Sequence, residues 1–504
     1  MATDGTSGGT SGGTSGGASG GASGPASRRW SFSWRAELPF LVTLGLAVVV
    51  RVTVAVAFPP AFLMSDGPTY LAYADDLHTS PDRPVGYSVF LRALSELSRS
   101  LVLVTSVQLV LGLLAAVAAY VLLRRWGVSP WVATLATVPM LFDAMQLLLE
   151  HAILSDVLFG FLLVAAVAAL AWSPTPHWTT TAVAGLLLGL ATLVRVLGEP
   201  TVVLAALFLL LVATSWRRRL LHAALVVVAF AIPVSAYVTW YHHDHGAWAI
   251  TQAGGRALYM RTTTFVDCRA LQVPDYERVL CPDDPIGHRQ DPTWYGWHSQ
   301  ETVPRLHPPA GVTDQEAMHD FAVRAIKAQP GDYARAVWRD FKLSFIIDDR
   351  HDHYEMSTSV KWTFEQYVDY QATPHWTRPA FEAHGGELPG TRQPMADTMA
   401  WYGRHVFLNG WGALALLALA VAGAVVPRRG RGASLRPLLL LTLALPLVLI
   451  LVPDVTAQFV WRYQLPLVVL LPLSAALGWT RLRAVRRPAP AADQPGTPAT
   501  ASTD

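Results

Sequence analysis

The chain has 504 residues, of which 52% are hydrophobic and 15% are charged, and its mean hydropathy is +0.33. A soluble protein carries about 25% charged residues, and the apolar residues here gather in blocks of about 20, the length that a helix needs to cross a bilayer. These values exclude an ordinary soluble domain, and a net charge of +2 with only short arginine clusters excludes a basic nucleic-acid-binding domain.

The chain begins with a low-complexity tract of Gly, Ser, Thr and Ala over residues 1–27. Such a composition cannot bury enough apolar surface to fold, and it has no apolar core of a signal peptide. The prediction is a disordered cytoplasmic tail over residues 1–35.

Ten apolar blocks follow, and each predicts a membrane-spanning helix. They lie near residues 38–58, 101–123, 131–149, 153–172, 179–197, 200–215, 220–241, 406–426, 435–453 and 462–480. We therefore predict a mainly α polytopic bundle with a transmembrane module over 36–241 and C-terminal helices over 406–480. A mixed exoplasmic domain of helices, short elements and loops is expected over 242–405, and a second cytoplasmic tail over 481–504.

Arginines in the short loops predict the orientation, because cytoplasmic loops carry an excess of Lys and Arg. With ten spans, every arginine cluster falls on the side of the N-terminus. The clusters are Arg28, Arg29 and Arg35; Arg124 and Arg125; Arg217, Arg218 and Arg219; Arg428, Arg429 and Arg431; and Arg481, Arg483, Arg486 and Arg487. Both termini are thus expected in the cytoplasm, and the acidic, aromatic loops on the exoplasmic face.

The first outer loop, residues 59–100, holds the first candidate residues in the stretch "MSDGPTYLAYADDLHTSPDRPVGYSVFLRAL". Asp66 follows the first span, where a carboxylate could act as a general base toward a hydroxyl or bind a cation. A lone aspartate is usually an ordinary solvated loop residue, but Tyr70 and the nearby prolines predict an ordered loop. Asp75 and Asp76 form an acidic pair, for which a solvated helix end is the alternative.

A second acidic group is Glu150, His151 and Asp156 in "LLLEHAILSDVLFG". Charges so close to hydrocarbon are costly unless they face protein or water. A functional re-entrant loop is one interpretation, and a simple polar turn between two spans is the other.

Three arginines lie at the outer ends of apolar blocks, against the usual charge bias: Arg51, Arg195 and Arg462; Arg256 and Arg261 lie early in the predicted exoplasmic domain. Guanidinium groups make bidentate, charge-assisted bonds to phosphate. The first three together predict a site for an anionic lipid headgroup, to which Arg256 and Arg261 could add. The alternative for each of the first three is a snorkelling side chain or an ion pair with Glu150, Asp156 or Glu199.

The long segment 242–405 holds the only cysteines, Cys268 and Cys281. Outside the cytoplasm a disulfide between them is expected, and two free thiols are the alternative. Thr313 and Glu316 have capping-box spacing and begin a helix that ends near Gln329. A second, amphipathic helix starts after it and is expected to lie along the membrane surface.

Two histidine-rich stretches, Tyr241–Trp248 and Asp348–Glu355, carry residue types that bind divalent metals. Neither has a sharp ligand spacing, so polar loops at the membrane surface are the preferred interpretation. A divalent metal is left possible, and no cofactor is predicted.

The stretch "SDGPTYLAYADDL…RPVGYSVFLRAL" resembles the first outer loop of GT-C fold glycosyltransferases, nearest to protein mannosyltransferases and lipid A aminoarabinose transferases. The stretches "EHAILSDVLFGFLL", "GLLLGLATLVRVLGEPTVV", "AVRAIKAQPGDYARAVWRD" and "FVWRYQLPLVVLLPL" resemble later parts of these enzymes in the same order. Val85 and Ser88 replace two prolines of the pattern. Gly67 stands where a second acid is usual, which argues against a protein mannosyltransferase.

The resemblance implies an inverting enzyme that uses a polyprenyl-phosphate sugar donor on the exoplasmic face, with Asp66 as catalytic base. The expected acceptor is a glycan, lipid or protein of the cell envelope. Arg195, Arg462, Arg51 and Arg256 are then expected to bind the donor phosphate. Acceptor-binding or supporting roles are expected for Asp75, Asp76, Tyr70, Arg83, Tyr87, Glu150, His151, Asp156 and Tyr463.

The competing prediction is a lipid or polysaccharide transporter, or a non-catalytic envelope-assembly subunit. Transporters commonly contain inverted repeats and broken helices at the midplane. No such symmetry is visible here, and the polar residues gather at one face. The Ala-, Arg-, Gly- and Pro-rich composition is typical of an actinobacterial genome, and a multi-pass plasma-membrane protein is expected.

Overall fold

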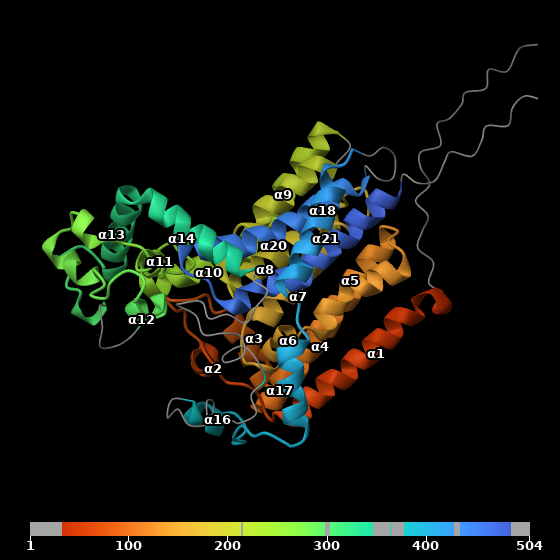
Figure 1. The fold of residues 1–504 in the computed structure, drawn as a ribbon, viewed down its shortest axis with the longest axis horizontal. Helices are drawn as coiled ribbons and strands as arrows, with labels where there is room; N and C mark the ends of the chain where they lie inside the picture. The colour runs from red at the N-terminus through yellow and green to blue at the C-terminus, as the bar shows by residue number, and fades with distance from the viewer. Residues whose placement is uncertain are drawn as a thin grey trace, which may run out of the picture. The chain divides into compact units, whose positions relative to one another are not determined.

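The computed structural model describes residues 33–212, 215–297, 303–345, 364, 377–427 and 434–484. These residues form helices and loops without a named β-strand, so the predicted mainly α membrane fold is confirmed (Figure 1). The apolar helices of the first part are α1 (Trp34–Ala57), α4 (Leu101–Arg125), α5 (Pro130–Phe142), α6 (Ala144–His151), α7 (Asp156–Leu170), α8 (Trp178–Val194), α9 (Thr201–Val212) and α10 (Trp216–His245).

The C-terminal part of the chain adds another set of helices. They are α17 (Met395–His405), α18 (Gly410–Val425), α20 (Arg436–Thr456) and α21 (Leu465–Arg483), the last preceded by the 3-10 turn η5 (Trp461–Gln464). Short elements on the loops are α2 (Gly67–Asp75), α3 (Gly86–Ser95) and the 3-10 turn η1 (Val196–Gly198).

Five described helices are long and apolar enough to cross a membrane, and two bent helix pairs raise this number to seven. The pairs are α5 with α6, bent by 50°, and α17 with α18, bent by 49°. Three shorter apolar stretches, Asp156–Leu170, Trp178–Val194 and Val196–Val212, occupy the remaining predicted blocks. The protein is therefore a polytopic membrane protein, and the number of ten spans stays a prediction.

The bend between α5 and α6 has a local cause at Asp143. Its carboxylate accepts hydrogen bonds from the backbone N–H groups of Met145 (2.9 Å) and Gln146 (3.3 Å), and so caps a new helix. It also accepts one from Leu408 N–H (2.6 Å), in the break of the other bent pair. One aspartate thus joins the two breaks, which the apolar pattern of the block 131–149 does not reveal.

Burial differs strongly between the helices, as expected for a bundle in lipid. α21 is apolar all round and lies in the core, whereas α1 and α10 leave large apolar side chains exposed, among them Val49, Val52, Val228 and Ile232. Exposed apolar faces of this kind are stable only against hydrocarbon or another protein. They fit helices at the lipid boundary.

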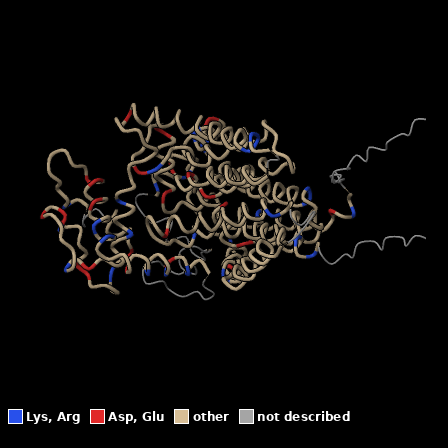
Figure 2. Tube along the Cα trace, turned by 90° about the horizontal axis from the view of Figure 1, so that it is seen from above, with Lys and Arg blue, Asp and Glu red and all other residues tan. Residues whose placement is uncertain are grey.

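Part of the segment predicted as exoplasmic forms a compact helical unit with its own core. Its helices are α11 (Gly254–Thr262), α12 (Pro292–Trp297), α13 (Asp314–Ala328) and α14 (Pro330–Leu343), which lie together at the left of Figure 1. Tyr259, Val266 and Phe321 are in the core. Charged residues are dense in this unit and sparse along the apolar helices (Figure 2).

Three sequence details of this unit are present in the structure. Cys268 and Cys281 form a disulfide with Cα atoms 6.0 Å apart. The capping box of Thr313 and Glu316 begins α13, and this helix ends at its C-cap residue Gln329, directly before α14. Trp338 of α14 is exposed, and the position of this helix along a membrane surface stays a prediction.

The remaining described helices of the segment 242–405 pack against other parts of the protein. α16 (Arg378–Ala383) contacts α2, and α17 contacts α1 and α6 of the bundle. The predicted boundary at residue 406 therefore divides a bent helical pair whose first half packs against the bundle. The histidine-rich stretch Asp348–Glu355 lies outside the described residues.

Candidate active site

Asp66 lies in a tightly held turn between α1 and α2. Phe62 forms a parallel β-bridge with Ala152, which fixes this loop to the loop between α6 and α7. Ser65 has a φ of +52°, a left-handed conformation that is rare for a residue other than Gly, Asn or Asp. Such strain is often kept at functional sites because it aims a neighbouring side chain. Here that neighbour is Asp66.

Gly67, the departure from the usual acid pair, is explained by close packing. A Cβ at this position would lie 2.8 Å from Leu63 Cδ1 and 3.0 Å from the carbonyl oxygen of Ile153. A second acidic side chain therefore has no room unless the loop moves.

We expect Gly67→Ala to lower any activity that depends on Asp66 by between about tenfold and a hundredfold, because small displacements of a reacting group are costly. The added methyl group pushes the loop away from Ile153 and displaces Asp66. Gly45→Ala is the matched control, since a Cβ at Gly45 meets nothing within 4 Å. Equal activity of the two variants would show that the close packing at Gly67 does not position Asp66.

Two arginines from distant parts of the chain hold the Asp66 carboxylate. Arg83 Nη1 lies 2.7 Å from Oδ1, and Arg462 Nη2 donates a hydrogen bond of 2.9 Å to Oδ2. Burial raises the pKa of Asp66, but the charges and hydrogen bonds of Arg462 and Arg83 outweigh it and place this pKa well below its usual range. The side chain remains 29% exposed, so a substrate can reach it.

A second carboxylate lies next to this clamp. Asp156, the first residue of α7, forms an ion pair of 2.6 Å with Arg195 Nη1 at the end of α8. Its other oxygen is 3.8 Å from Arg462 Nη1. We call Asp66, Arg83, Arg462, Asp156 and Arg195 the charged ring.

Polar and aromatic side chains close the ring on its other side. Tyr70 and Ser155 share a hydrogen bond of 3.2 Å, and Arg195 Nη1 donates one of 3.5 Å to Ser155 Oγ. Arg83 lies over the Tyr70 ring, 5.5 Å from its centroid, and Arg195 and Arg462 lie 5.4 and 5.6 Å from the ring centroid of Tyr463. Burial raises the pKa of Tyr70, and so does the charge of Asp66.

Ser155 has no sequence signal of its own. Its place directly before Asp156, in a loop that resembles an acid-containing family loop, is the signal that could have found it. The structure thus adds one hydroxyl to the site that the residue types alone do not reveal.

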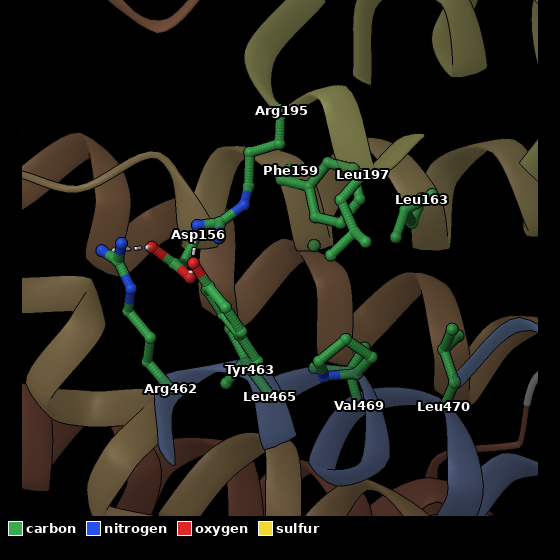
Figure 3. Close-up of a pocket in the computed structure, with 12 residues that line it drawn as sticks. Asp156, Phe159, Leu163, Arg195, Leu197, Arg462, Tyr463, Leu465, Val469 and Leu470 are labelled. Atoms are coloured by element: carbon green, nitrogen blue, oxygen red, sulfur yellow. Dashed lines mark ion pairs between the residues drawn. The ribbon is translucent and has the colours of Figure 1, made fainter. Parts of the chain in front are cut away.

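Three members of the charged ring, Asp156, Arg195 and Arg462, line a narrow and partly open pocket. Arg195, Arg462 and Asp156 lie at its polar end, and apolar side chains continue from there between α7, η1 and α21 (Figure 3). The apolar lining consists of Phe159, Leu163, Leu197, Leu465, Pro466, Val469 and Leu470. The pocket therefore offers a charged group at one end and a hydrocarbon surface along its walls.

Arg51, expected to bind phosphate, lies instead in a buried ion pair with Glu150 of α6. Its Nη2 is 2.7 Å from Glu150 Oε1, and both side chains are at most 2% exposed. Gln146 donates a hydrogen bond of 2.8 Å to the same oxygen, and Arg51 Nη1 donates one of 2.8 Å to the carbonyl of Leu141. The ion-pair alternative holds for Arg51, because α1 brings it under the α5–α6 bend and away from the pocket.

Two further residues expected near the site, His151 and Tyr87, instead make buried hydrogen bonds away from the pocket. His151 is buried, with Nε2 2.6 Å from the carbonyl oxygen of Phe58. Tyr87 donates a hydrogen bond of 2.7 Å to Gln108, and burial raises the pKa of Tyr87 well above its usual value. Neither lines the pocket.

Arg256 also lies away from the pocket lining. Its Nη1 is 3.3 Å from Asp82 Oδ1, and its guanidinium stacks 4.3 Å from the ring centroid of Trp297. Arg261 is buried against Asp340. These pairs connect α11 to the first outer loop and to α14, so the structure brings neither arginine to the site around Asp66.

The acidic pair of the first loop lies at the far end of α2. Asp75 pairs with Arg99 at 2.5 Å and lies 3.5 Å from His384 Nε2. Asp76 is 94% exposed. The solvated-helix-end alternative therefore describes Asp76 well, and Asp75 belongs to the contact with α16.

The described histidine-rich stretch contacts its own residues and the first outer loop. His242 stacks on Trp248, and His245 Nε2 lies 3.1 Å from the carbonyl oxygen of Thr79. Within the described ranges no three His, Cys, Asp or Glu side chains converge in a way that could hold a metal ion.

Comparison with known families gives one match within the chain. Residues 95–245 match the family described as dolichyl-phosphate-mannose-protein mannosyltransferase. This segment includes Asp156, Ser155 and Arg195 of the site. The resemblance predicted from the sequence, to the protein mannosyltransferase group, is confirmed there. No curated protein sequence matches the chain.

Three solved structures are similar at low identity. The Saccharomyces cerevisiae protein O-mannosyltransferase Pmt1–Pmt2 complex bound to the sugar donor is 14% identical, covering 51% of this chain and 38% of that chain, with a TM-score of 0.35. The Archaeoglobus fulgidus oligosaccharyltransferase AglB, with an inhibitory peptide and a dolichol-phosphate, is 13% identical over 89% and 51%, with a TM-score of 0.41. ArnT from Cupriavidus metallidurans bound to undecaprenyl phosphate is 14% identical over 88% and 77%, with a TM-score of 0.37.

The chain spans less than two thirds of the first two of these proteins. Similarities of this size do not transfer an activity or a site residue to this chain. The charged ring and its pocket are therefore the features of this chain that bear on its function.

Proposed function

We propose that this membrane protein is a glycosyltransferase that moves a monosaccharide from a polyprenyl-phosphate donor to a cell-envelope acceptor on the exoplasmic face. The observation that carries the proposal is the amphiphilic pocket, with Arg195 and Arg462 at one end and apolar walls beyond them. A phosphate attached to an isoprenoid chain has the same order of charged and apolar parts. Guanidinium groups bind phosphate by charge-assisted hydrogen bonds.

In the proposed step Asp66 acts as general base. It takes the proton of an acceptor hydroxyl while the hydroxyl oxygen forms a bond to the anomeric carbon. The bond between that carbon and the phosphate oxygen breaks, and its electron pair stays on the phosphate. Attack from the face opposite the leaving phosphate inverts the anomeric configuration. Arg195 and Arg462 stabilise the charge that develops on the phosphate.

The charge of the ring fits this step. Three arginines and two aspartates leave one net positive charge, which a donor phosphodiester with a single negative charge balances. After transfer the phosphate monoester carries roughly −1.5 to −2, while Asp66 has become neutral by taking the proton. Charge in the buried site is therefore nearly balanced before and after the reaction.

Transfer of a radiolabelled sugar tests the proposal directly. The full-length protein in proteoliposomes is given polyprenyl-phosphate mannose or arabinofuranose with cell-envelope extract as acceptor. We expect labelled glycan to form, with the anomeric configuration opposite to that of the donor. Movement of intact lipid-linked sugar across the bilayer without any transfer would instead support the transporter alternative.

We expect Arg195→Gln to lower kcat/KM for the donor by about a hundredfold, the typical effect of removing one group that stabilises a developing oxyanion. Arg92→Gln is the matched control, because Arg92 is exposed, pairs with Glu96 and does not line the pocket. Steady-state kinetics of both variants provide the measurement. If Arg195→Gln had the same kcat/KM as Arg92→Gln, Arg195 would not be part of the proposed donor site.

A further inference from the structure

We propose that Arg462 is shared between two anions, the Asp66 carboxylate and the donor phosphate, so that donor binding withdraws Arg462 from Asp66 and frees the base. This inference rests on the proposed function and gives Arg462 a second role as the residue that couples donor binding to catalysis. It also assigns Arg83 as the positioning residue that keeps Asp66 in place.

The geometry of the clamp leads to this assignment. A general base must offer an oxygen to the acceptor hydroxyl, yet Arg83 holds Oδ1 and Arg462 holds Oδ2. The same two charges outweigh burial and keep the pKa of Asp66 well below its usual range, which makes Asp66 a weak base. One of the two partners has to leave before Asp66 can take a proton at neutral pH.

Arg462 is the partner that a phosphate can remove. Arg462 lines the pocket, whereas Arg83 does not. Arg462 is part of η5, which directly precedes α21 and its apolar side chains in the pocket wall. Its Nη1 is 3.8 Å from Asp156, so its guanidinium already lies between two carboxylates. Arg195 holds Asp156 at 2.6 Å, whereas Arg462 lies closer to Asp66 (2.9 Å) than to Asp156 (3.8 Å).

Arg83 is suited to remain with Asp66 after the exchange. It lies over Tyr70, and the adjacent Asp82 pairs with Arg256 of α11. The carbonyl of Pro81 accepts a hydrogen bond of 2.8 Å from Gln252 N–H. The loop that carries Arg83 is thus fixed by contacts with α11 and with the segment just before it. Oδ1 stays bound while Oδ2 becomes available, so Asp66 keeps its direction.

Carbodiimide labelling of Asp66 reads this exchange without any sugar transfer, because carbodiimides react with protonated carboxyl groups. The full chain in detergent is treated with a carbodiimide and an amine, with and without farnesyl phosphate, and Asp66 is quantified by mass spectrometry. We expect labelling to rise about tenfold with farnesyl phosphate, the change in protonated fraction that one pKa unit gives. Farnesol, which lacks the phosphate, and inorganic phosphate, which lacks the chain, show which part of the ligand acts.

Two variants separate the roles of the arginines. Arg462→Gln is expected to label rapidly without lipid and to show no further rise with farnesyl phosphate. Arg83→Gln is expected to keep the lipid-dependent rise, because its Arg462 is still present. Asp76, which is almost fully exposed, serves as the internal control for reagent access.

Unchanged Asp66 labelling of the wild-type protein at saturating farnesyl phosphate would overturn the inference, and this result needs no variant. A lipid-dependent rise in Arg462→Gln equal to that of the wild type would overturn it as well. The proposed function fails separately: labelling that rises with lipid, in a protein that transfers no sugar, would leave the exchange intact and refute the transferase.

Discussion

Asp66→Asn is expected to lower the rate of sugar transfer about a thousandfold, within the range that general base catalysis contributes. Asparagine keeps the size of the side chain but cannot accept the acceptor proton. It also leaves Arg83 and Arg462 without the carboxylate that both of them bind. Single-turnover transfer from a bound donor is the measurement that isolates the chemical step.

The control for this prediction is Asp76→Asn in the same loop. Asp76 is 94% exposed at the end of α2, so the Asp76→Asn variant should transfer sugar at the wild-type rate. Donor binding by Asp66→Asn should be retained, since Arg195 and Arg462 are still present. Wild-type transfer by Asp66→Asn would reject Asp66 as the base.

Arg51→Met is expected to lower the free energy of unfolding by about 3–5 kcal/mol, the typical cost of removing one partner of a buried ion pair. Glu150 is fully buried and would lose its charged partner, while Gln146 alone would still bind it. Unfolding by SDS titration in mixed micelles measures the change. The effect on activity should follow the fraction of folded protein.

The double variant Arg51→Met with Glu150→Gln separates an unpaired charge from lost packing. It should recover most of the stability, because a neutral amide no longer needs the guanidinium. If Arg51→Met instead unfolded at the wild-type SDS fraction while its donor KM rose, Arg51 would act on the substrate, as the sequence first indicated.

The membrane fold could be predicted from the sequence because blocks of about 20 apolar residues have few other stable structures. Asp66, Arg195 and Arg462 could be selected for a similar reason, since charges at the ends of apolar blocks are costly without a partner. The structure places these three residues within one ring, although they are separated by hundreds of positions in the chain.

Other features depend on contacts that periodicity does not encode. Arg51 and Arg195 both pair with a carboxylate, and only packing decides that Arg195 also lines the pocket while Arg51 is enclosed. Asp143 breaks an apolar block by capping a helix. Glycine fits at position 67 because the backbone of Ile153, in another loop, lies close to it.

The decisive measurement is a structure of the full chain with a bound polyprenyl phosphate. If the pocket binds the donor, the phosphate lies within hydrogen-bond distance of Arg195 and Arg462, and the isoprenoid chain runs along Phe159, Leu163 and Val469. A phosphate bound elsewhere, with the pocket left to other molecules, would contradict donor binding in this pocket.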